Sequence, residues 1–313
     1  MLSSAKSRRS NSRRSRPTGN LAAESETIGR ALAHVRARLL DSGAVSDDEE
    51  ARAEADILLA HALSTDSTGP VTSMTRPLPS EAADRLAHLL KRRLQREPLR
   101  YITGSCPFFG RDFVVDRRVL IPRQETELVV ERALEWAERH GAGRIADIGT
   151  GSGVLAVTLA LELDGAAVQA VDISPDALEV AAENARRHGA DAMIEYHEGY
   201  LAEPLRGRFD IVAANLPYVL TERMGEVEPE VAAEPRLALD GGPDGLDLIG
   251  RLIPQLPGLL SPLCGEAIAL LEIDPAVVDG VRRLVEEHMP GADLQIIDDL
   301  AGFARVARIL VGA

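Results

Sequence analysis

The sequence has little cysteine and no long apolar stretch, and both shortages limit what the protein can be. Only two of its 313 residues are cysteines, Cys106 and Cys264, and they lie far apart without the spacing of metal ligands. Such a pair predicts reduced thiols in a cytosolic protein, with no bound metal. Because no apolar run approaches the length that crosses a bilayer, we expect no membrane-spanning segment.

Acidic residues are absent from the first 20 residues, which carry six Lys or Arg side chains. The net charge of the whole chain is −14, so the rest of it carries −20. A body this acidic repels phosphate backbones, and we expect no stable complex with nucleic acid. Residues 1–24 also lack the apolar core of a secretory signal; they are interpreted as a disordered basic tail, with an organelle transit peptide as the alternative.

The remaining composition, 45% hydrophobic and 27% charged, is typical of a globular protein with one large or two modest domains. Apolar residues at helical spacing predict a helical domain over residues 25–100. Its helices are expected near residues 28–39, 51–63 and 81–94, with a Ser/Thr/Gly/Pro-rich break at 64–80. Since this domain is too small for a catalytic cleft, we interpret it as a substrate-recognition module, with a packing appendage as the alternative.

Residues 101–121 have a strand-like pattern. Phe108 and Phe113 lie on either side of residues 110–112, a Gly-Arg-Asp sequence typical of a turn. We expect a β-hairpin that links the helical domain to the rest of the chain.

Strand and helix patterns alternate through residues 122–313, which predicts an α/β fold with a mostly parallel sheet covered by helices on both faces. The last two strands are separated by only residues 299–303, too few for a parallel crossover, so this pair should be antiparallel. Seven such strands are typical of the nucleoside-binding methyltransferase fold. The predicted strands are residues 144–148, 168–173, 193–197, 209–214, 267–273, 294–298 and 304–311, and the predicted helices are residues 154–163, 175–188, 245–260 and 275–288.

A glycine-rich turn follows the first predicted strand and opens a helix. Glycines in this position let the backbone approach a ligand and direct helix N-terminal amides at it. The spacing is Gly-x-Gly-x-Gly instead of the dinucleotide Gly-x-Gly-x-x-Gly, and the preceding Asp repels phosphate but suits an ammonium group. The methionine part of S-adenosylmethionine therefore fits this turn better than a pyrophosphate. The candidate contacts are Asp147, Gly149, Thr150, Gly151, Ser152 and Gly153.

Two further strand ends carry polar side chains. Asp172 ends the second strand, where a carboxylate can accept both hydroxyls of a ribose. The fourth strand ends in Asn215, Leu216, Pro217 and Tyr218, hereafter the Asn215 tetrad. The Asn215 side chain and the Leu216 carbonyl can each accept one N–H of a planar amine, which would direct its nitrogen at a methyl donor. Pro217 would stiffen the loop and Tyr218 would line the plane of the amine, although Asn and Pro also favour a plain turn.

Four other segments have distinctive sequences: residues 52–61, 98–104, 119–127 and 234–247. Together with the glycine-rich turn and the Asn215 tetrad, they resemble the release factor glutamine methyltransferases, which methylate the side-chain amide of a glutamine in a protein. The resemblance extends from about residue 28 to the C-terminus.

The resemblance implies a helical domain that holds the protein substrate and a domain at residues 122–313 that binds S-adenosylmethionine. It further implies that the Asn215 tetrad holds the glutamine amide, with Asn215 also touching the donor, and that Tyr200 and Leu201 lie beside the adenine. The partner would be a peptide chain release factor, and the enzyme would be cytoplasmic.

The chain departs from the family's usual pattern at four places. The family usually has Asn-Pro-Pro-Tyr, and here Leu216 replaces the first of these prolines. The family usually has Pro-Arg-Pro-Glu, and here Gln124 replaces the second proline. Tyr200 replaces an Asp that would accept from the adenine amino group, and a usual Glu-Gly pair is replaced within residues 272–274. The first of these changes is tolerable, because this position acts through its backbone carbonyl and Leu216 still supplies one.

Two alternatives stay open at this point. The form Asn-Leu-Pro-Tyr also occurs in ribosomal RNA adenine dimethyltransferases, so methylation of adenine N6 in RNA or DNA is one. Tyr200 and Asp274 raise the other, a diverged protein that binds a partner without catalysis.

Overall fold

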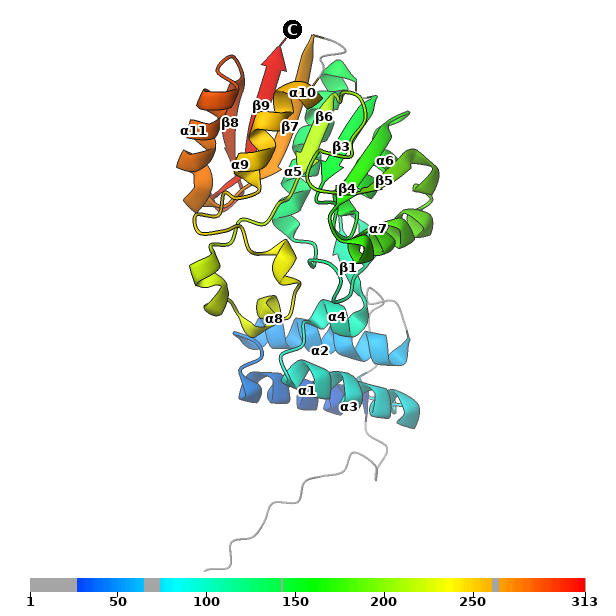
Figure 1. The fold of residues 1–313 in the computed structure, drawn as a ribbon. Coiled ribbons are helices and arrows are strands. Elements are labelled where there is room, and N and C mark those ends of the chain that lie inside the picture. Colours follow the sequence, from blue (N-terminus) through cyan, green and yellow to red (C-terminus); the bar gives the residue numbers. More distant parts are fainter. Residues whose placement is uncertain (1–26, 65–73, 142, 261–264, 313) are drawn as a thin grey trace, which may run out of the picture. The chain divides into compact units, whose positions relative to one another are not determined.

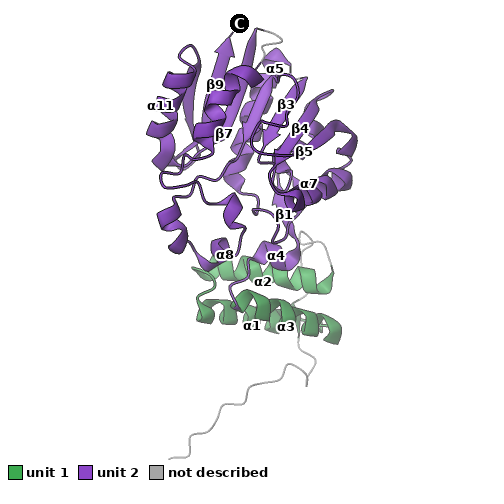
Figure 2. Cartoon of the chain, viewed as in Figure 1, with its two compact units in different colours: residues 1–94 green, residues 95–313 purple. Residues whose placement is uncertain are grey.

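The structure is a computed structural model that describes residues 27–64, 74–141, 143–260 and 265–312. The chain divides into two compact units, residues 1–94 and 95–313 (Figure 2). The predicted basic tail, most of the predicted break at 64–80, and Cys264 lie outside the described residues. No helix among the described residues is both long enough and apolar enough to cross a membrane.

The first unit consists of three helices, α1 (Ile28–Ser42), α2 (Asp48–Leu63) and α3 (Ser80–Leu94). Asp47 caps the start of helix α2, and its side chain accepts hydrogen bonds from two backbone N–H groups of the first turn. Apolar side chains that recur at helical spacing, such as Leu39 and Leu58, are completely buried. All three helices lie where the apolar pattern predicts them.

A short hairpin opens the second unit after α4 (Leu99–Thr103). Its strands are β1 (Ser105–Phe108) and β2 (Arg111–Val114), joined by Phe109 and Gly110. Both turn residues have positive φ, +46° and +74°, the backbone twist that suits a two-residue hairpin. The predicted turn at residues 110–112 was therefore displaced, because Arg111 already pairs with Phe108 in the ladder.

A seven-stranded sheet forms the centre of the second unit (Figure 1). The strand order is β5-β4-β3-β6-β7-β9-β8, and β9 runs antiparallel to both of its neighbours. The predicted α/β fold and the antiparallel final pair are confirmed, and every predicted strand lies within two residues of an observed one. The strands are β3 (Arg144–Ile148), β4 (Ala167–Asp172), β5 (Ile194–Glu198), β6 (Ile211–Ala214), β7 (Glu266–Glu272), β8 (Asp293–Asp298) and β9 (Ala304–Gly312).

Helices cover both faces of this sheet, because successive strand residues such as Ile145 and Ala146 belong to opposite hydrophobic cores. One core contains residues of α5, α6 and α7, and the other contains residues of α9, α10 and α11. The helices of the second unit after α4 are α5 (Glu127–His140), α6 (Val154–Glu162), α7 (Pro175–His188), α8 (Pro229–Ala232), α9 (Ile249–Leu252), α10 (Leu256–Leu259) and α11 (Val278–His288).

The continuous helix predicted over residues 245–260 was wrong. Gly245 has a φ of +74°, which no α-helix contains, and regular helix begins only at Ile249. Pro254 and Pro257 then divide the segment into two short α-helices joined by a 3-10 turn, since neither proline can donate a backbone hydrogen bond.

Candidate active site

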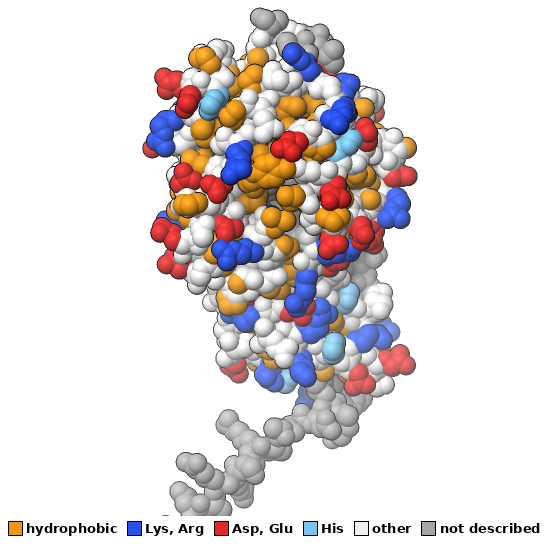
Figure 3. Space-filling view, in the orientation of Figure 1, with side chains coloured by type: hydrophobic (Ala, Val, Ile, Leu, Met, Phe, Trp, Pro, Cys, Tyr) orange, Lys and Arg blue, Asp and Glu red, His pale blue; other side chains and the backbone are white. Residues whose placement is uncertain are grey.

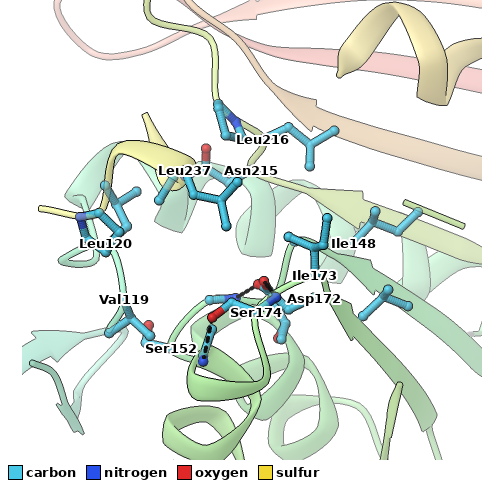
Figure 4. Close-up of a pocket in the computed structure, with 18 of the residues that line it drawn as sticks. Val119, Leu120, Ile148, Ser152, Asp172, Ile173, Ser174, Asn215, Leu216 and Leu237 are labelled. Atoms are coloured by element: carbon cyan, nitrogen blue, oxygen red, sulfur yellow. Dashed lines mark hydrogen bonds between the residues drawn. The ribbon is translucent and has the colours of Figure 1, made fainter. Parts of the chain in front are cut away.

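A cavity opens at the carboxyl ends of β3, β4, β5 and β6, where the strand order of the sheet reverses direction (Figure 4). Such a switch point is where α/β sheets bind ligands. All of its lining residues lie between Arg118 and Leu248, within the second unit. Ten of the thirteen residues assigned to the site from the sequence line the cavity: Gly149, Thr150, Gly151, Ser152, Asp172, Tyr200, Leu201, Asn215, Leu216 and Pro217.

The glycine-rich turn forms one wall. The backbone N–H groups of Gly149 and Thr150 both donate to the Val171 carbonyl, at 2.8 and 2.9 Å, which ties the turn to the end of β4. Gly149 has a φ of +77°, and a Cβ there would lie 2.9 Å from the Leu216 side chain. The backbone conformation therefore requires glycine here, and the end of the Leu216 side chain fills the space beside it.

Gly153 begins α6 without lining the cavity. A Cβ on this residue would lie 3.0 Å from the Ala181 Cα of α7. Its role in the described structure is to let α6 and α7 pack closely, which fixes the direction in which the first turn of α6 points.

Asp147 lies behind the glycine-rich turn instead of in the cavity wall. Its side chain is completely buried, and Oδ2 accepts from the Thr150 hydroxyl at 2.7 Å and from the Ala156 N–H at 3.0 Å. Burial raises the pKa of this carboxyl to about 7. Asp147 holds the turn in place, and its part in binding an ammonium group stays a prediction.

Asp172 connects the turn to β4 from inside the cavity. Its two carboxylate oxygens accept from the Gly151 N–H and the Ser174 N–H, each at 2.9 Å. Figure 4 shows Asp172, Ser174 and Ser152 together on one side of the cavity, with Asn215, Leu216 and Leu237 on the other. Burial raises the pKa of Asp172. Each oxygen keeps a further lone pair that a ligand hydroxyl can use.

The Asn215 side-chain amide is held from behind. Its Nδ2 donates to the Thr126 hydroxyl at 3.1 Å. Among the described residues, neither Asn215 Oδ1 nor the Leu216 carbonyl has a hydrogen-bond partner. Both atoms belong to residues that line the cavity, so the site offers two unused acceptors beside the glycine-rich turn.

Tyr218 is not among the residues that line the cavity, and its place beside the acceptor plane stays a prediction. Its hydroxyl donates to Glu272 Oε1 at 3.1 Å. Burial and the Glu272 charge raise the pKa of Tyr218, so it stays protonated. The ring thus supports the tetrad from inside the protein.

The segment after β6 completes the wall. Glu234, 6% exposed, accepts from the Ile121 N–H at 2.9 Å and forms an ion pair with Arg123. Burial raises the pKa of Glu234, and Arg123 opposes this shift. The contact brings Leu237 to the cavity, where 59% of this residue remains exposed.

Residues 240–245 pack on the backbone of the tetrad. The Gly241 N–H donates to the Val219 carbonyl at 2.8 Å, and the Val219 N–H donates to the Leu239 carbonyl at 3.0 Å. A Cβ on Gly241 would lie 2.6 Å from the Tyr218 Cα, and one on Gly245 would lie 2.5 Å from the Tyr218 carbonyl oxygen. Glycine is needed at positions 241 and 245 because this loop packs against the Tyr218 backbone too closely to leave room for a Cβ.

Sequence reasoning did not assign several residues of this site. Thr126 and Glu234 lay within the segments that carried the family resemblance, which was the available signal. Arg123 and Leu237 lay within the same two segments. The unassigned residues are Arg123, Thr126, Glu234, Leu237 and Glu272.

A seven-stranded sheet with this order, a glycine-rich turn after β3 and an Asn-x-Pro-Tyr sequence after β6 define an S-adenosylmethionine-dependent methyltransferase. Solved structures agree on the fold: the hMettl16 catalytic domain, solved in complex with a 3'UTR hairpin, has a TM-score of 0.50 and 15% identity, with 74% of this chain and 81% of that one covered.

Sequence comparison identifies the family. Residues 30–104 match the PrmC N-terminal domain, and residues 124–241 match the ribosomal protein L11 methyltransferase (PrmA) family. A release factor glutamine methyltransferase of Moorella thermoacetica is 41% identical over 88% of this chain and 95% of its own length. One of Geobacter sulfurreducens is 44% identical over 75% of this chain and 81% of its own. The chain belongs to the release factor glutamine methyltransferase family.

Proposed function

We propose that the protein transfers a methyl group from S-adenosylmethionine to the side-chain amide nitrogen (N5) of a glutamine in a peptide chain release factor. The observation that carries the proposal is the Asn215 amide, tied by Nδ2 to Thr126 and therefore able to offer Oδ1 as an acceptor. We infer the acceptor protein, a release factor, from the names of the relatives. We also propose that the enzyme acts in the cytoplasm, together with the release factor.

The residues around the cavity fit the methyl donor. Gly149 leaves no side chain between the turn and a ligand, and Asp172 has lone pairs for the hydroxyls of a ribose. Tyr200 and Leu201 lie in the same wall and would contact the adenine. When bound, S-adenosylmethionine supplies a methyl group that its sulfonium has already activated.

On the acceptor side the protein mainly positions a weak nucleophile. The lone pair of an amide nitrogen is delocalised, so the site must orient it rather than deprotonate it. Asn215 Oδ1 and the Leu216 carbonyl would each accept one N–H of the glutamine, which stabilises the positive charge that grows on nitrogen. Pro217 would stiffen the loop directly after them.

We propose the same division of labour for the whole chain that the sequence suggested. Residues 1–24 would form a basic tail, 25–100 a substrate-recognition domain, 101–121 a linking hairpin and 122–313 the catalytic domain. The partner is a protein; we expect no membrane and no stable nucleic-acid complex.

The alternative acceptor, an adenine in nucleic acid, has little support from the surface. On the face of the larger unit drawn in Figure 3, Lys and Arg are interspersed with Asp and Glu. This face therefore presents no uniformly basic surface for a phosphate backbone. The third possibility is a binding protein without catalysis. It would not explain why two hydrogen-bond acceptors, Asn215 Oδ1 and the Leu216 carbonyl, lie beside the glycine-rich turn without partners among the described residues.

One assay separates these functions. The protein is incubated with methyl-labelled S-adenosylmethionine and either a purified release factor or ribosomal RNA, and labelled peptides are sequenced by mass spectrometry. We expect label on one glutamine side chain. Label in the RNA alone would refute the proposal, and calorimetry without detectable donor binding would refute any methyl transfer.

A further inference from the structure

Among the described residues of the second unit, four large apolar side chains are exposed to solvent. Ile173 and Leu237 line the cavity, so a bound ligand would cover them. Leu300 and Phe303 are not among the lining residues, and the proposed transfer gives them no role. Single exposed apolar residues are ordinary, but these two belong to one turn between β8 and β9, residues 299–303, hereafter the Leu300 turn.

Asp299 holds the Leu300 turn in one conformation. Its Oδ1 accepts from the Ala301 and Phe303 N–H groups, each at 2.9 Å, and its Oδ2 accepts from Arg305 Nε at 2.9 Å. The Phe303 N–H and the Arg305 side chain lower the pKa of Asp299, so the carboxylate stays ionised at neutral pH. The turn therefore presents its side chains from a fixed backbone, which lowers the entropy that a partner's binding would cost.

The tip of this turn is apolar and uncharged. Residues 300–303 are Leu-Ala-Gly-Phe and all of them are exposed, Leu300 completely. Folding gains little from a large apolar side chain that stays in water, so the fold alone does not account for Leu300. The guanidinium of Arg305 lies 5.9 Å from the centre of the Phe303 ring, but it is paired with Asp299. Such a tip fits an apolar protein surface better than a phosphate backbone.

The Leu300 turn lies at the same edge of the sheet as the cavity. Glu272, the last residue of β7, pairs with Val306 near the start of β9, so the turn lies beside the carboxyl ends of the parallel strands (Figure 1). Neighbouring strands are about 4.8 Å apart, which places β9 about 10 Å and β8 about 14 Å from β6, the strand that ends at the Asn215 tetrad.

A protein that brings a glutamine to Asn215 must cover this edge. The amide nitrogen of a glutamine is four bonds, about 5 Å, from its Cα, so the backbone of the partner has to reach the mouth of the cavity. A standard interface buries about 800 Å² on each protein, the area of a flat disc with a radius of about 16 Å. An interface of this size centred on the Asn215 tetrad includes the Leu300 turn.

We propose that the Leu300 turn is a docking surface for the acceptor protein, where Leu300 and Phe303 pack against an apolar patch of the release factor near its glutamine. This inference rests on the proposed function, because that function names the release factor as the partner. The contact would orient the partner on the second unit, so that the glutamine enters the cavity.

The first test measures binding without methyl transfer. The full-length protein, with the demethylated donor S-adenosylhomocysteine bound, is titrated with a purified release factor by calorimetry. In the double variant Leu300→Ser/Phe303→Ser, we expect Kd for the release factor to rise about tenfold or more, as when apolar contacts in an interface are truncated. Binding of S-adenosylhomocysteine should be unchanged, because neither residue lines the cavity. Equal affinity of the wild type and the double variant for the release factor would overturn this inference.

Ala301→Ser and Phe303→Leu are the matched controls. Ala301 is exposed in the same turn but is small, and Phe303→Leu keeps an apolar side chain. Both should keep most of the wild-type affinity, and thermal unfolding of every variant should match the wild type because the changed side chains are exposed. A loss of affinity in Ala301→Ser as large as in the double variant would show that the two apolar side chains are not the cause, and would overturn the proposal.

The second test compares two acceptors. A five-residue peptide centred on the acceptor glutamine extends about 7 Å to either side and does not reach β9 or β8. In the double variant, KM for the intact release factor should rise about tenfold, whereas kcat and KM for the peptide should stay at their wild-type values. An equal loss with both acceptors would contradict a docking role.

The outcomes distinguish this inference from the proposed function. A wild type that binds the release factor without methylating it would overturn only the proposed function, and a wild type that binds no release factor would overturn both. Sedimentation of the protein alone tests a second copy of the chain as the occupant of the turn. A wild-type dimer that becomes a monomer in the double variant would replace the release factor with that second copy and overturn the inference.

Discussion

In the proposed transfer, Asn215 acts through one oxygen atom. Its nitrogen is occupied by Thr126, and Oδ1 and the neighbouring Leu216 carbonyl remain the acceptors that a primary amide can use. An Asn side chain can both donate and accept, so it selects a donor only when its NH2 group is held by another partner. In Asn215 that partner is the Thr126 hydroxyl.

Asn215→Ala should therefore separate transfer from donor binding. Removing Oδ1 takes away one of two acceptors for the substrate amide, and we expect kcat to fall by about 100-fold or more. The affinity for S-adenosylmethionine, measured by calorimetry, should change far less, because the glycine-rich turn and Asp172 remain. Wild-type turnover in this variant would show that the amide is held elsewhere.

Asp147 predicts an unusual pH dependence of stability. Its pKa rises from an ordinary value of 3.8 to about 7 in the folded protein, so the stabilisation from the protonated form is present at low pH and is lost as the pH rises through 7. Between about pH 5 and pH 8, the wild type should lose roughly 2–3 kcal/mol relative to Asp147→Asn. Urea unfolding of both proteins without the donor measures this difference, and parallel pH profiles would contradict it.

At the scale of elements, the tetrad depends on a loop far along the chain. Residues 240–245 lie directly on the backbone of Tyr218 and Val219, and their glycines are the reason that the two backbones can meet. The loop thus supports the acceptor site without contributing a side chain to it.

Gly241→Ala should disturb that support. The added methyl group would lie 2.6 Å from the Tyr218 Cα, so one backbone must move. We expect a loss of about 1–3 kcal/mol in the free energy of unfolding and a fall in kcat with little change in donor affinity. Gly225→Ala is the control: a Cβ there meets no atom within 4 Å, and it should behave like the wild type.

The strands were predictable because each is a short apolar run between turn residues. The glycine-rich turn was predictable because its three glycines lie within five consecutive residues. The broken helix over residues 245–260 was not, since apolar spacing outweighed Pro254 and Pro257 in the prediction. The contact of Asn215 with Thr126 joins residues 89 positions apart, and no local pattern specifies it. The complete burial of the Asp147 side chain was not predictable either, because sequence order cannot show that it faces inward.

At the scale of the molecule, the cavity belongs to the second unit. Every described residue that lines it falls within residues 95–313. The described residues of the helical unit, 27–64 and 74–94, are not among them. Its proposed part is recognition of the protein that carries the glutamine.

A chain that lacks residues 1–94 should therefore bind S-adenosylmethionine with nearly unchanged affinity and methylate an intact release factor poorly. We expect KM for the release factor to rise about tenfold or more, as when a second binding contact is lost. A short peptide around the acceptor glutamine should be affected much less. Donor binding that disappears although circular dichroism shows a folded protein would contradict this division.

One contact described above restricts how such an enzyme can change over generations. The Leu216 side chain occupies the space that a Cβ at position 149 would need, so the turn beside the donor and the loop beside the acceptor share one small volume. A larger residue at position 149 would displace the end of the Leu216 side chain and would also have to adopt a φ of +77°. A smaller residue at position 216 removes only the first of these two obstacles, so the backbone of the turn limits change at position 149 more than the loop does.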